Sequence, residues 1–339
     1  MAAPSLRDVV LDPEWIPHTF SVTGTTLTFV HVPRAARDGL MFLSDEHFAG
    51  DFDKVDFPES AVAAAVGEAP RAPIHFIFHT SFCCSTLFAR ALDVPEATTA
   101  LKEPDVFINL GNRFIRSDDQ VNRRRLELIL RLLERPFAPG ETVIVKPSNF
   151  GNRLLENILA LRPRSNAVLL YSDVETFLRS LLKRGMFGRI FGRRLFTQLR
   201  GWSRIDFGYG PDELLQLTDV QAMALAWLMQ IDHFDAIARA FGDRVVLIDS
   251  PTLLADPASA VETAQALFGL GLDRERVEAI ASGPVFSRHS KFTDRQYDAE
   301  ARGKEHDAAT EAHAEELQMV VKWIAAVAAH VGAPLRPGS

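Results

Sequence analysis

The sequence predicts an α/β protein in which helices surround a parallel sheet of about five strands, preceded by an N-terminal extension that contains β-structure. Two observations support this class. From residue 71 onward, short apolar segments alternate with longer segments of helical periodicity, which is typical of a parallel sheet wound with helices. Residues 1–70 instead contain an alternating segment at 25–32 and a short apolar segment at 40–43, separated by proline and aspartate. We therefore expect an extension over residues 1–70 and a main domain over residues 71–339.

Five segments of the main domain are expected to form buried strands, because each is short and apolar or β-branched. They lie at residues 74–78, 97–101, 142–146, 167–171 and 244–248. Helical periodicity predicts helices at residues 85–92, 122–135, 150–162, 173–185, 212–241, 251–268 and 306–330. Gly140, Gly242, Gly269 and Gly271 fall where connections between these elements are expected.

Composition and charge exclude several classes of protein. The 339 residues are 47% hydrophobic and 24% charged, and 37 basic against 44 acidic residues give a net charge of −7. This acidic balance argues against a general nucleic-acid coat protein, whose phosphate contacts need a cationic surplus. No apolar segment reaches the roughly 18 residues of a membrane-spanning helix, and the first residues lack the apolar core of a secretory signal.

The two cysteines, Cys83 and Cys84, are adjacent in the chain. Neighbouring cysteines rarely bridge each other, because the disulfide would strain the intervening peptide, so we expect a reducing, cytoplasmic compartment. No grouping of His, Cys and Asp has the spacing of a zinc site, and no G-x-S-x-G nucleophile elbow occurs. The sequence therefore gives no support to a metalloenzyme or an α/β-hydrolase.

The most informative segment is the loop that follows the first strand of the main domain. An apolar strand at 74–78 leads into small and hydroxyl-bearing residues and then into a helix. Such a turn aims backbone N–H groups and the positive end of a helix at one point, which suits a phosphate or sulfate. No glycine lies between Gly67 and Gly111, so this is not a G-x-x-x-x-G-K-[ST] loop of an ATPase or GTPase. The alternative is a buried strand followed by an N-capped core helix.

This loop resembles the 5′-phosphosulfate loop of the sulfotransferase family, which reads like P-[KR]-S-G-[ST]-T-L. Those enzymes use 3′-phosphoadenosine-5′-phosphosulfate (PAPS) as the donor. The resemblance implies a P-loop, three-layer fold of sulfotransferase type. Phe82 stands where the family has a basic residue, and Cys84 replaces its glycine. The residues that the resemblance assigns to the 5′-phosphosulfate are Ser81, Phe82, Cys83, Cys84, Ser85 and Thr86.

A second segment resembles the family's 3′-phosphate element, R-[DN]-P-x-D-x-x-x-S, and follows the strand at 167–171. Asp173 and Ser180 fit the spacing, while Ser172 stands at the arginine position. The resemblance therefore implies that Ser172 and Ser180 lie at the 3′-phosphate and that another cation is needed there. Nearby choices are Arg179, Lys183 and Arg184. The alternative is a helix capped by Asp173 with a solvated basic face.

Ionisable residues follow two other predicted strands. Lys102 and Glu103 precede a proline, and this segment resembles the K/R-E-P of several bacterial and carbohydrate sulfotransferases. The resemblance makes Glu103 a candidate base for the acceptor and Lys102 a candidate cation for the sulfuryl group, since ligands bind at the carboxyl ends of parallel strands. Lys146 similarly looks like the family's lysine after the third strand. His79, on the loop itself, is the alternative base.

Two basic segments lie further along the chain. Arg288 and Lys291 sit in a loop that resembles the C-terminal basic loop closing over the nucleotide in sulfotransferases. Residues 179–204 carry eight Lys or Arg side chains and no acid, interleaved with aromatic residues. Four glycines there predict a mobile segment rather than one long helix, Gly185, Gly188, Gly192 and Gly201. This segment is interpreted first as a lid over the donor. The alternatives are a dock for an anionic partner, a membrane-surface or RNA-binding segment, and a solvated amphipathic helix with its Phe residues on the core side.

The sequence thus favours a sulfotransferase-like enzyme that moves a sulfuryl group from PAPS to a hydroxyl or amine, with no metal required. The acceptor is expected to be a small molecule, a glycan or a peptide. Two other hypotheses stay open. One is a phosphotransferase or other nucleotide-dependent tailoring enzyme on the same scaffold, which magnesium dependence would mark. The other is a non-catalytic nucleotide-binding protein, which would bind nucleotide without transfer.

Overall fold

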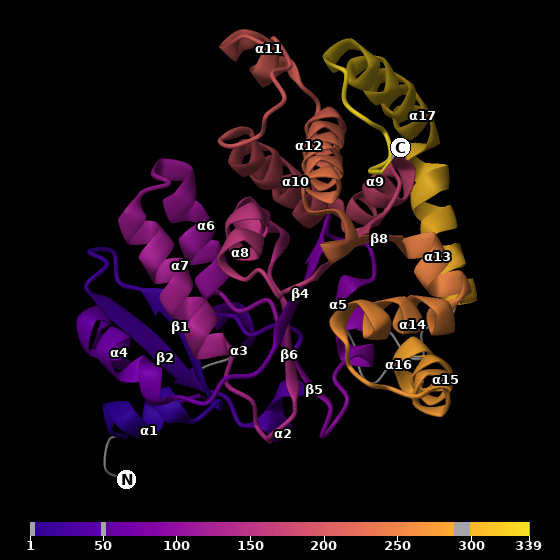
Figure 1. Cartoon of the computed structure of the whole chain (residues 1–339). Coiled ribbons are helices and arrows are strands. Elements are labelled where there is room, and N and C mark those ends of the chain that lie inside the picture. The colour runs from indigo at the N-terminus through magenta and orange to yellow at the C-terminus, as the bar shows by residue number, and fades with distance from the viewer. Residues whose placement is uncertain (1–3, 49–51, 288–298, 339) are drawn as a thin grey trace. The chain divides into compact units, whose positions relative to one another are not determined.

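A computed structural model describes residues 4–48, 52–287 and 299–338 of the chain (Figure 1). Two compact units divide these residues. Unit 1 comprises Met1–Phe78, Thr86–Ala167 and Val261–Ala281, and unit 2 comprises His79–Ser85, Val168–Ala260 and Ser282–Ser339. Each unit is therefore assembled from three separate segments of the chain.

An antiparallel three-stranded sheet forms the extension in unit 1. Its order is β1 (Trp15–Phe20), β2 (Thr26–His31) and β3 (Lys54–Pro58), and Trp15 pairs with His31 where β1 meets β2. The predicted alternating segment at 25–32 is thus β2, with Leu27, Phe29 and Val30 buried. The apolar segment at 40–43 lies in no strand, and only Leu43 of its four residues is buried.

The main sheet has five strands, as the sequence predicts. Its order is β5 (Thr98–Lys102), β6 (Thr142–Lys146), β4 (Ile74–His79), β7 (Ala167–Tyr171) and β8 (Val245–Asp249). The pairs β4–β6 and β5–β6 are parallel. Every residue of β4, β5, β6 and β7 is buried, which explains why these strands read as continuous apolar runs rather than as alternating patterns. The protein is therefore α/β with a parallel sheet.

Helices make up most of the remaining chain. Those that begin before β7 are α1 (Leu6–Leu11), α2 (Arg34–Arg37), α3 (Asp45–Phe48), α4 (Glu59–Ala65), η1 (Val66–Glu68), α5 (Ser85–Ala91), α6 (Val106–Arg116), α7 (Gln120–Leu133), η2 (Asn149–Leu154) and α8 (Leu155–Leu161). Those after β7 are α9 (Val174–Leu182), α10 (Gly185–Arg200), α11 (Pro211–Gln216), α12 (Asp219–Phe241), η3 (Gly242–Arg244), α13 (Ser250–Ala255), α14 (Pro257–Phe268), α15 (Arg274–Ser282), α16 (Pro284–Ser287) and α17 (Ala299–Val331).

A buried arginine attaches the extension to the rest of unit 1. Arg135, just after α7, donates to the backbone carbonyls of Val9, Val10 and Asp12 at 2.8–3.0 Å and to that of Trp15 at 2.5 Å. Its guanidinium is almost fully buried, and this burial lowers its pKa to about 9. The carbonyl groups of the α1–β1 turn therefore supply the hydrogen bonds that make burial of this cation tolerable.

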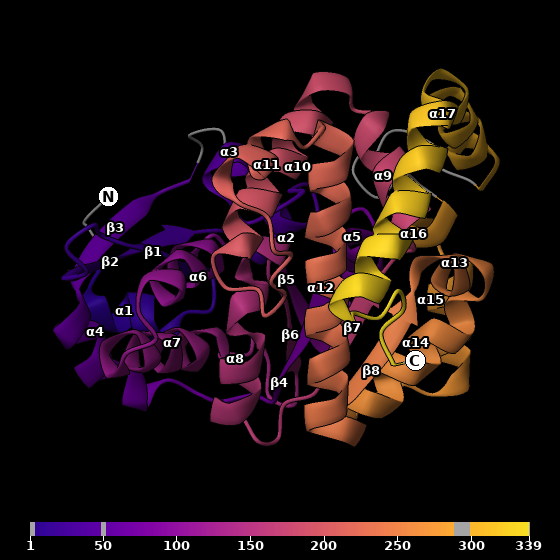
Figure 2. The same cartoon turned by 90° about the horizontal axis from the view of Figure 1, so that it is seen from above.

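Unit 2 is built around the long helix α12, which packs on α10, α9 and α17 (Figure 2). Fifteen of the 23 residues of α12 are buried, including Trp227, whose indole donates to the Ser172 carbonyl at 2.8 Å. The predicted helix 212–241 is in fact two helices. The break falls at Leu217 and Thr218, and Thr218 caps α12 by accepting a hydrogen bond from the Gln221 amide.

The basic segment is not one long helix, because α9 ends at Leu182 and α10 is a separate continuous helix of 16 residues that begins at Gly185. The mobility of this segment stays a prediction. Two of its glycines are packing sites. A Cβ atom at Gly188 would lie 1.9 Å from the carbonyl oxygen of Leu181, and one at Gly192 would lie 2.1 Å from Cγ of Met223. Glycine is needed at both positions so that α10 can approach α9 and α12 closely, rather than to loosen the chain.

A related correction concerns the predicted helix 251–268. It divides at Asp256, between α13 and α14, where Asp256 caps α14 by accepting a hydrogen bond from the Ser259 amide at 3.0 Å. Among the helices of the described residues, none is long and apolar enough to span a membrane.

Candidate functional site

The loop between β4 and α5 has an unusual backbone conformation. Ser81, Phe82 and Cys84 all have positive φ angles, of 72°, 54° and 64°. Left-handed conformations cost L-residues roughly 1–2 kcal/mol each, and no glycine relieves that cost here. Strained backbone persists where the surrounding structure fixes it, and such strain is typical of ligand-binding turns. The loop is therefore a candidate anion-binding turn in its own right.

Hydrogen bonds within unit 2 hold this loop in place. The Thr80 amide donates to the carbonyl of Leu170 in β7 at 3.1 Å, and the Cys83 thiol donates to the same carbonyl at 3.3 Å. Cys83 is buried and Cys84 is partly exposed. Both cysteines thus act here as small residues of a fixed turn, and Cys83 additionally anchors the turn to the sheet.

His79 is committed to the same loop. It is buried, and its Nδ1 accepts a hydrogen bond from the Ser81 amide at 3.1 Å. That bond requires an unprotonated Nδ1, so the neutral ring carries its proton on Nε2. To act as a base, His79 would have to take up a proton at Nδ1 and break this bond. The contact favours a structural role for His79 over a catalytic one.

Three buried hydroxyl groups of unit 2 follow three neighbouring strands. Thr80 follows β4, Ser172 follows β7 and Ser250 begins α13 after β8, and each is fully buried. None of the three hydroxyl oxygens has a hydrogen-bond partner among the residues that the structure describes. Buried polar atoms are nearly always hydrogen-bonded in proteins, so such a row indicates a place for a polar ligand or ordered water. Ser172 is a residue that the family resemblance assigned to the nucleotide.

The remainder of the predicted 3′-phosphate element lies on α9. Asp173 caps this helix by accepting a hydrogen bond from the Thr176 amide at 2.8 Å, so the predicted cap is present. Ser180 is buried on α9, and Arg179 forms an ion pair with Glu175 one turn earlier. The helix thus brings Ser172 and Ser180 to its two ends, in unit 2.

Lys102 and Lys146 lie opposite each other in unit 1, because β5 and β6 pair in the register Lys102 to Lys146. The Lys102 ammonium is buried and donates to the carbonyls of Arg37 and Leu40, both at 2.8 Å. Burial lowers its pKa to about 8. In the structure this ammonium therefore holds the backbone that follows α2, whereas the sequence predicts a cation for the sulfuryl group.

Glu103 and Lys146 form an ion pair in unit 1. The Lys146 side chain is fully buried, and its ammonium also lies 5.2 Å from the centre of the Phe42 ring. Glu103 has a positive φ of 51°, and its amide donates to the Lys146 carbonyl at 2.6 Å. A strained residue with a partly exposed carboxylate, oriented by a buried cation, is what a positioned base requires.

The remaining predicted site residues are placed as follows. Ser85 and Thr86 are buried at the start of α5, and Phe82 packs against aromatic residues of α9 and α10. Arg288 and Lys291, predicted for the 3′-phosphate, lie outside the described residues.

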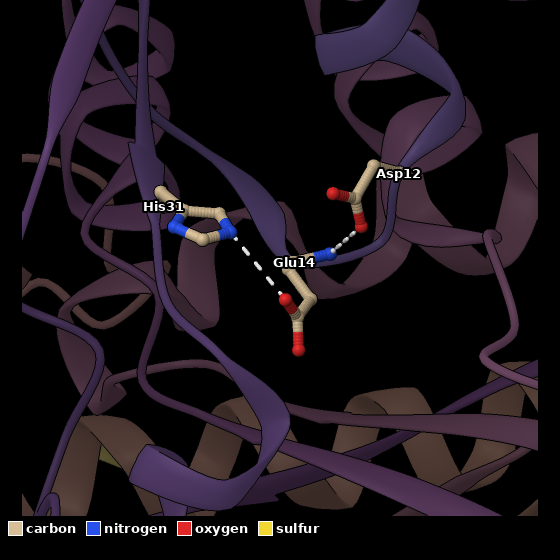
Figure 3. A group of neighbouring side chains, drawn as sticks. All are labelled: Asp12, Glu14 and His31. Atoms are coloured by element: carbon tan, nitrogen blue, oxygen red, sulfur yellow. Dashed lines mark hydrogen bonds and ion pairs between the residues drawn. The ribbon is translucent and has the colours of Figure 1, made fainter. Parts of the chain in front are cut away.

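The structure also brings together residues that the sequence did not single out. Asp12, Glu14 and His31 have possible metal-ligand atoms within 4.8 Å of one another (Figure 3). Asp12 accepts a hydrogen bond from the Glu14 amide at 2.8 Å, and the Glu14 carboxylate lies 3.4 Å from Nε2 of His31. The Glu14 carboxylate also accepts from the Arg34 amide at 2.7 Å. Their spacing in the sequence gives no signal, because only the β1–β2 pairing brings His31 to the other two.

A second such group consists of His18, Asp45 and Asp105. The imidazole of His18 is buried and lies 2.9 Å from Asp45. The ammonium of Lys54 contacts the same Asp45 oxygen at 2.5 Å, so this group already holds a cation of the chain itself. These contacts join β1 and β3 to the α3 segment. They explain why the three side chains lie together without invoking a metal ion.

The fold and the loop define an α/β protein with a strained strand–loop–helix turn and buried hydroxyl groups beside it. No family model matches the sequence, and no curated protein matches it. Among solved structures, the sulfotransferase domain from the curacin biosynthetic pathway is similar, at 11% identity and a TM-score of 0.40, over 76% of this chain and 99% of that one. The sulfotransferase STF1 from Mycobacterium tuberculosis is similar at 14% identity and a TM-score of 0.41, over 74% and 79% of the two chains.

The mouse sulfotransferase SULT7A1, solved in complex with PAP, is similar at 11% identity and a TM-score of 0.35, over 80% of this chain and 97% of that one. At such identities and scores a likeness carries no argument about chemistry.

Proposed function

We propose that this protein transfers a sulfuryl group from PAPS to a hydroxyl or amine acceptor. The observation that carries the proposal is the turn after β4, in which three non-glycine residues adopt left-handed conformations. This turn occupies the frame of the family's 5′-phosphosulfate loop, and residues 85–87 match that frame as Ser-Thr-Leu. The buried hydroxyl groups of Thr80 and Ser172 support it, since both lack protein partners among the described residues.

In the proposed reaction the sulfur–oxygen bond to the 5′-phosphate of PAPS breaks, and adenosine 3′,5′-bisphosphate leaves. A new sulfur–oxygen or sulfur–nitrogen bond forms to the acceptor. Glu103 takes the acceptor's proton, and Lys146 orients its carboxylate. Transfer of this kind resembles phosphoryl transfer in its loose, in-line geometry, so positioning and charge stabilisation supply most of the catalysis. The turn at 80–86 and the residues Ser172 and Ser180 are assigned to the donor.

The proposal is tested by calorimetric titration and thermal shift with adenosine 3′,5′-bisphosphate, ATP and GTP, each with and without magnesium. A ligand at a hundred times its Kd stabilises the native state by roughly 2.7 kcal/mol, which is readily measured. We expect a preference for the bisphosphate that magnesium does not change. Labelled PAPS then serves to screen acceptors.

A matched pair of variants ties the result to the turn. Thr86→Val removes a hydroxyl at nearly constant volume and should weaken bisphosphate binding, whereas Thr23→Val, in the exposed β1–β2 turn, should not. Preference for ATP or GTP with magnesium would instead indicate phosphoryl chemistry. If none of the three nucleotides binds, the protein has no donor site and the proposed function is wrong.

The base is tested separately. Glu103→Gln should leave bisphosphate affinity unchanged and lower turnover by about 10²–10⁴-fold, since a positioned general base contributes on that order. Turnover is measured well below the unfolding temperature of the variant. Full activity in Glu103→Gln would show that Glu103 is not the base and would leave His79 as the candidate.

A further inference from the structure

The turn after β4 lacks a cation of its own. Residues 79–86 contain neither lysine nor arginine. An anionic group held by backbone amides in a partly buried turn is bound far more strongly when a guanidinium or ammonium donates to it as well. A phosphate or sulfate ester at this turn therefore needs a positive charge from elsewhere in the chain.

The structure places one arginine on a side chain of this turn. The guanidinium carbon of Arg184 lies over the Phe82 ring, 5.3 Å from the ring centre. The same ring makes edge contacts with Phe177 of α9 at 6.4 Å and with Phe191 of α10 at 5.7 Å. Phe82 is thus held by aromatic residues on both helices and offers a face to the cation.

The backbone at the α9–α10 junction fixes the position of Arg184. This residue is the N-cap of α10, and its amide donates to the Leu181 carbonyl at 3.0 Å. Gly188 packs against this junction, because a Cβ there would lie 1.9 Å from the Leu181 carbonyl oxygen and 3.3 Å from Cβ of Arg184. The missing side chain at Gly188 allows α10 to start close to the end of α9, and this carries Arg184 to Phe82.

We propose that Arg184, held on the Phe82 ring, supplies the positive charge for the sulfate or phosphate ester bound at residues 80–86. A guanidinium over an aromatic face donates through its edge, in the geometry that suits a tetrahedral oxyanion. The left-handed φ of 54° at Phe82 supports this assignment, because a bulky residue adopts such a φ only when its surroundings constrain it. This inference rests on the proposed function and assigns to it a residue outside the loop.

The test compares Arg184→Gln, Arg184→Ala and Arg184→Lys with the wild type by calorimetry. The probes are adenosine 3′,5′-bisphosphate, adenosine 5′-phosphosulfate and adenosine. Loss of a charge-assisted hydrogen bond should weaken both anionic probes about ten- to hundred-fold and leave adenosine nearly unchanged. Arg184→Lys should lose less affinity for the anionic probes than Arg184→Gln, because it keeps a positive charge. A purely structural role would weaken all three probes together.

Two further variants sharpen the test. Arg193→Ala removes an α10 arginine that is ion-paired with Asp219, so it is a matched charge control and should bind like the wild type. Phe82→Arg combined with Arg184→Ala moves the cation onto the loop and should recover most of the lost affinity. Thermal unfolding of every variant is measured in parallel, and Arg184→Gln carries the comparison should Arg184→Ala not fold.

The outcomes separate this inference from the proposed function. If the wild type binds none of the anionic probes, the proposed function fails. If the wild type binds them and both Arg184→Gln and Arg184→Ala bind within two-fold of it, the assignment of Arg184 is overturned while the donor site stands. Equal losses for adenosine and for the anionic probes would likewise overturn the assignment.

Discussion

At the scale of single residues, the Glu103–Lys146 ion pair links stability to the proposed chemistry. Lys146 is fully buried, whereas 15% of the Glu103 side chain is exposed. Removing one partner of such a pair leaves the other charge buried and uncompensated. The residue proposed as the base is therefore also a residue that the fold of unit 1 requires.

The pair should show strong coupling in a double-mutant cycle. Glu103→Gln and Lys146→Met should each lower the free energy of unfolding by on the order of 3 kcal/mol. The double variant should lose at least about 1 kcal/mol less than the sum of the two, because no unpaired charge remains. Urea unfolding at neutral pH measures all four proteins. Strictly additive losses would show that the two side chains do not stabilise each other.

His75 in β4 provides a residue-scale prediction about pH. It is buried, its ring stacks on Phe268 at 4.9 Å, and its Nδ1 accepts from the Asn166 amide at 3.0 Å. Burial lowers its pKa to about 4 from the ordinary value of 6.5. Between these values the unfolded chain binds a proton that the folded chain does not. Stability should therefore be fully present above pH 6.5 and fall as the pH drops toward 4.

The variant His75→Gln isolates this contribution, since glutamine can still accept the Asn166 hydrogen bond but does not titrate. From pH 7 to pH 5 the wild type should lose about 2 kcal/mol more than His75→Gln, at roughly 1.4 kcal/mol per pKa unit. Urea unfolding at the two pH values gives the difference. Parallel pH dependence in the two proteins would mean that His75 does not contribute to acid sensitivity.

At the scale of elements, the two packing glycines of α10 determine how closely this helix approaches its neighbours. At Gly188 the obstacle to a Cβ is a backbone carbonyl, that of Leu181, whereas at Gly192 it is the flexible side chain of Met223. A backbone cannot move without displacing a helix, while a methionine can change rotamer. The two positions should therefore differ in their tolerance of alanine.

Gly188→Ala should destabilise the protein by about 1–3 kcal/mol, because overpacking exceeds the gain of about 1 kcal/mol in helix propensity. Gly192→Ala should cost less. In the double variant Gly192→Ala with Met223→Ala, the new methyl group partly fills the space left by Met223, so the loss should be smaller than the sum of the single losses. Thermal and urea unfolding measure these differences. A larger cost at Gly192 than at Gly188 would contradict the packing argument.

The glycines also show what sequence patterns can and cannot predict about elements. The strands at 142–146 and 167–171 are predicted to the residue, because they are buried on both faces and read as uninterrupted apolar runs. In α10 the packing role of Gly188 and Gly192 could not be predicted. A glycine that permits close packing and a glycine that loosens the chain look identical in sequence. Helix α6 is not among the predicted helices, and it too contains a glycine at a close contact. A Cβ at its Gly111 would lie 3.0 Å from the Phe150 carbonyl oxygen.

For the candidate site, too, the sequence predicts some features and not others. The location of the site stays a prediction from the sequence, made because polar residues after buried strands mark the carboxyl edge of a parallel sheet. Its contacts do not follow from the sequence. The donation of Lys102 to two carbonyl groups and the contact of Arg184 with Phe82 depend on how segments distant in sequence are packed. Residue spacing carries no information about such pairs.

At the scale of the whole molecule, the extension is tied into unit 1 by Arg135. Four backbone carbonyls between Val9 and Trp15 accept hydrogen bonds from this one buried guanidinium. The composition change near residue 70 thus marks a change of structure type, from the antiparallel sheet to the parallel one. The hydrogen bonds of Arg135 join the residues before this boundary to those after it.

A chain that begins at residue 71 should therefore not fold cooperatively. It loses every carbonyl acceptor that the α1–β1 turn gives to Arg135, and it exposes the faces of α6 and α7 that pack against β1. Burial of each large apolar side chain contributes roughly 1.5–3 kcal/mol, against a typical total stability of about 5–15 kcal/mol. Circular dichroism during heating measures the transition. A sharp transition at the wild-type temperature in the truncated chain would show that the extension is dispensable.

The division of each unit into three chain segments has a consequence for biosynthesis. Unit 1 includes residues 261–281, so its last segment leaves the ribosome only when most of the 339-residue chain has been translated. Unit 2 begins within the loop at 79–85 and ends at the C-terminus. Unit 1 cannot be completed before residues 79–85 and 168–260 of unit 2 have been translated, so the two units cannot fold strictly in succession from the N-terminus. Nascent chains of this protein are thus expected to depend on chaperones until residues 261–281 have been translated.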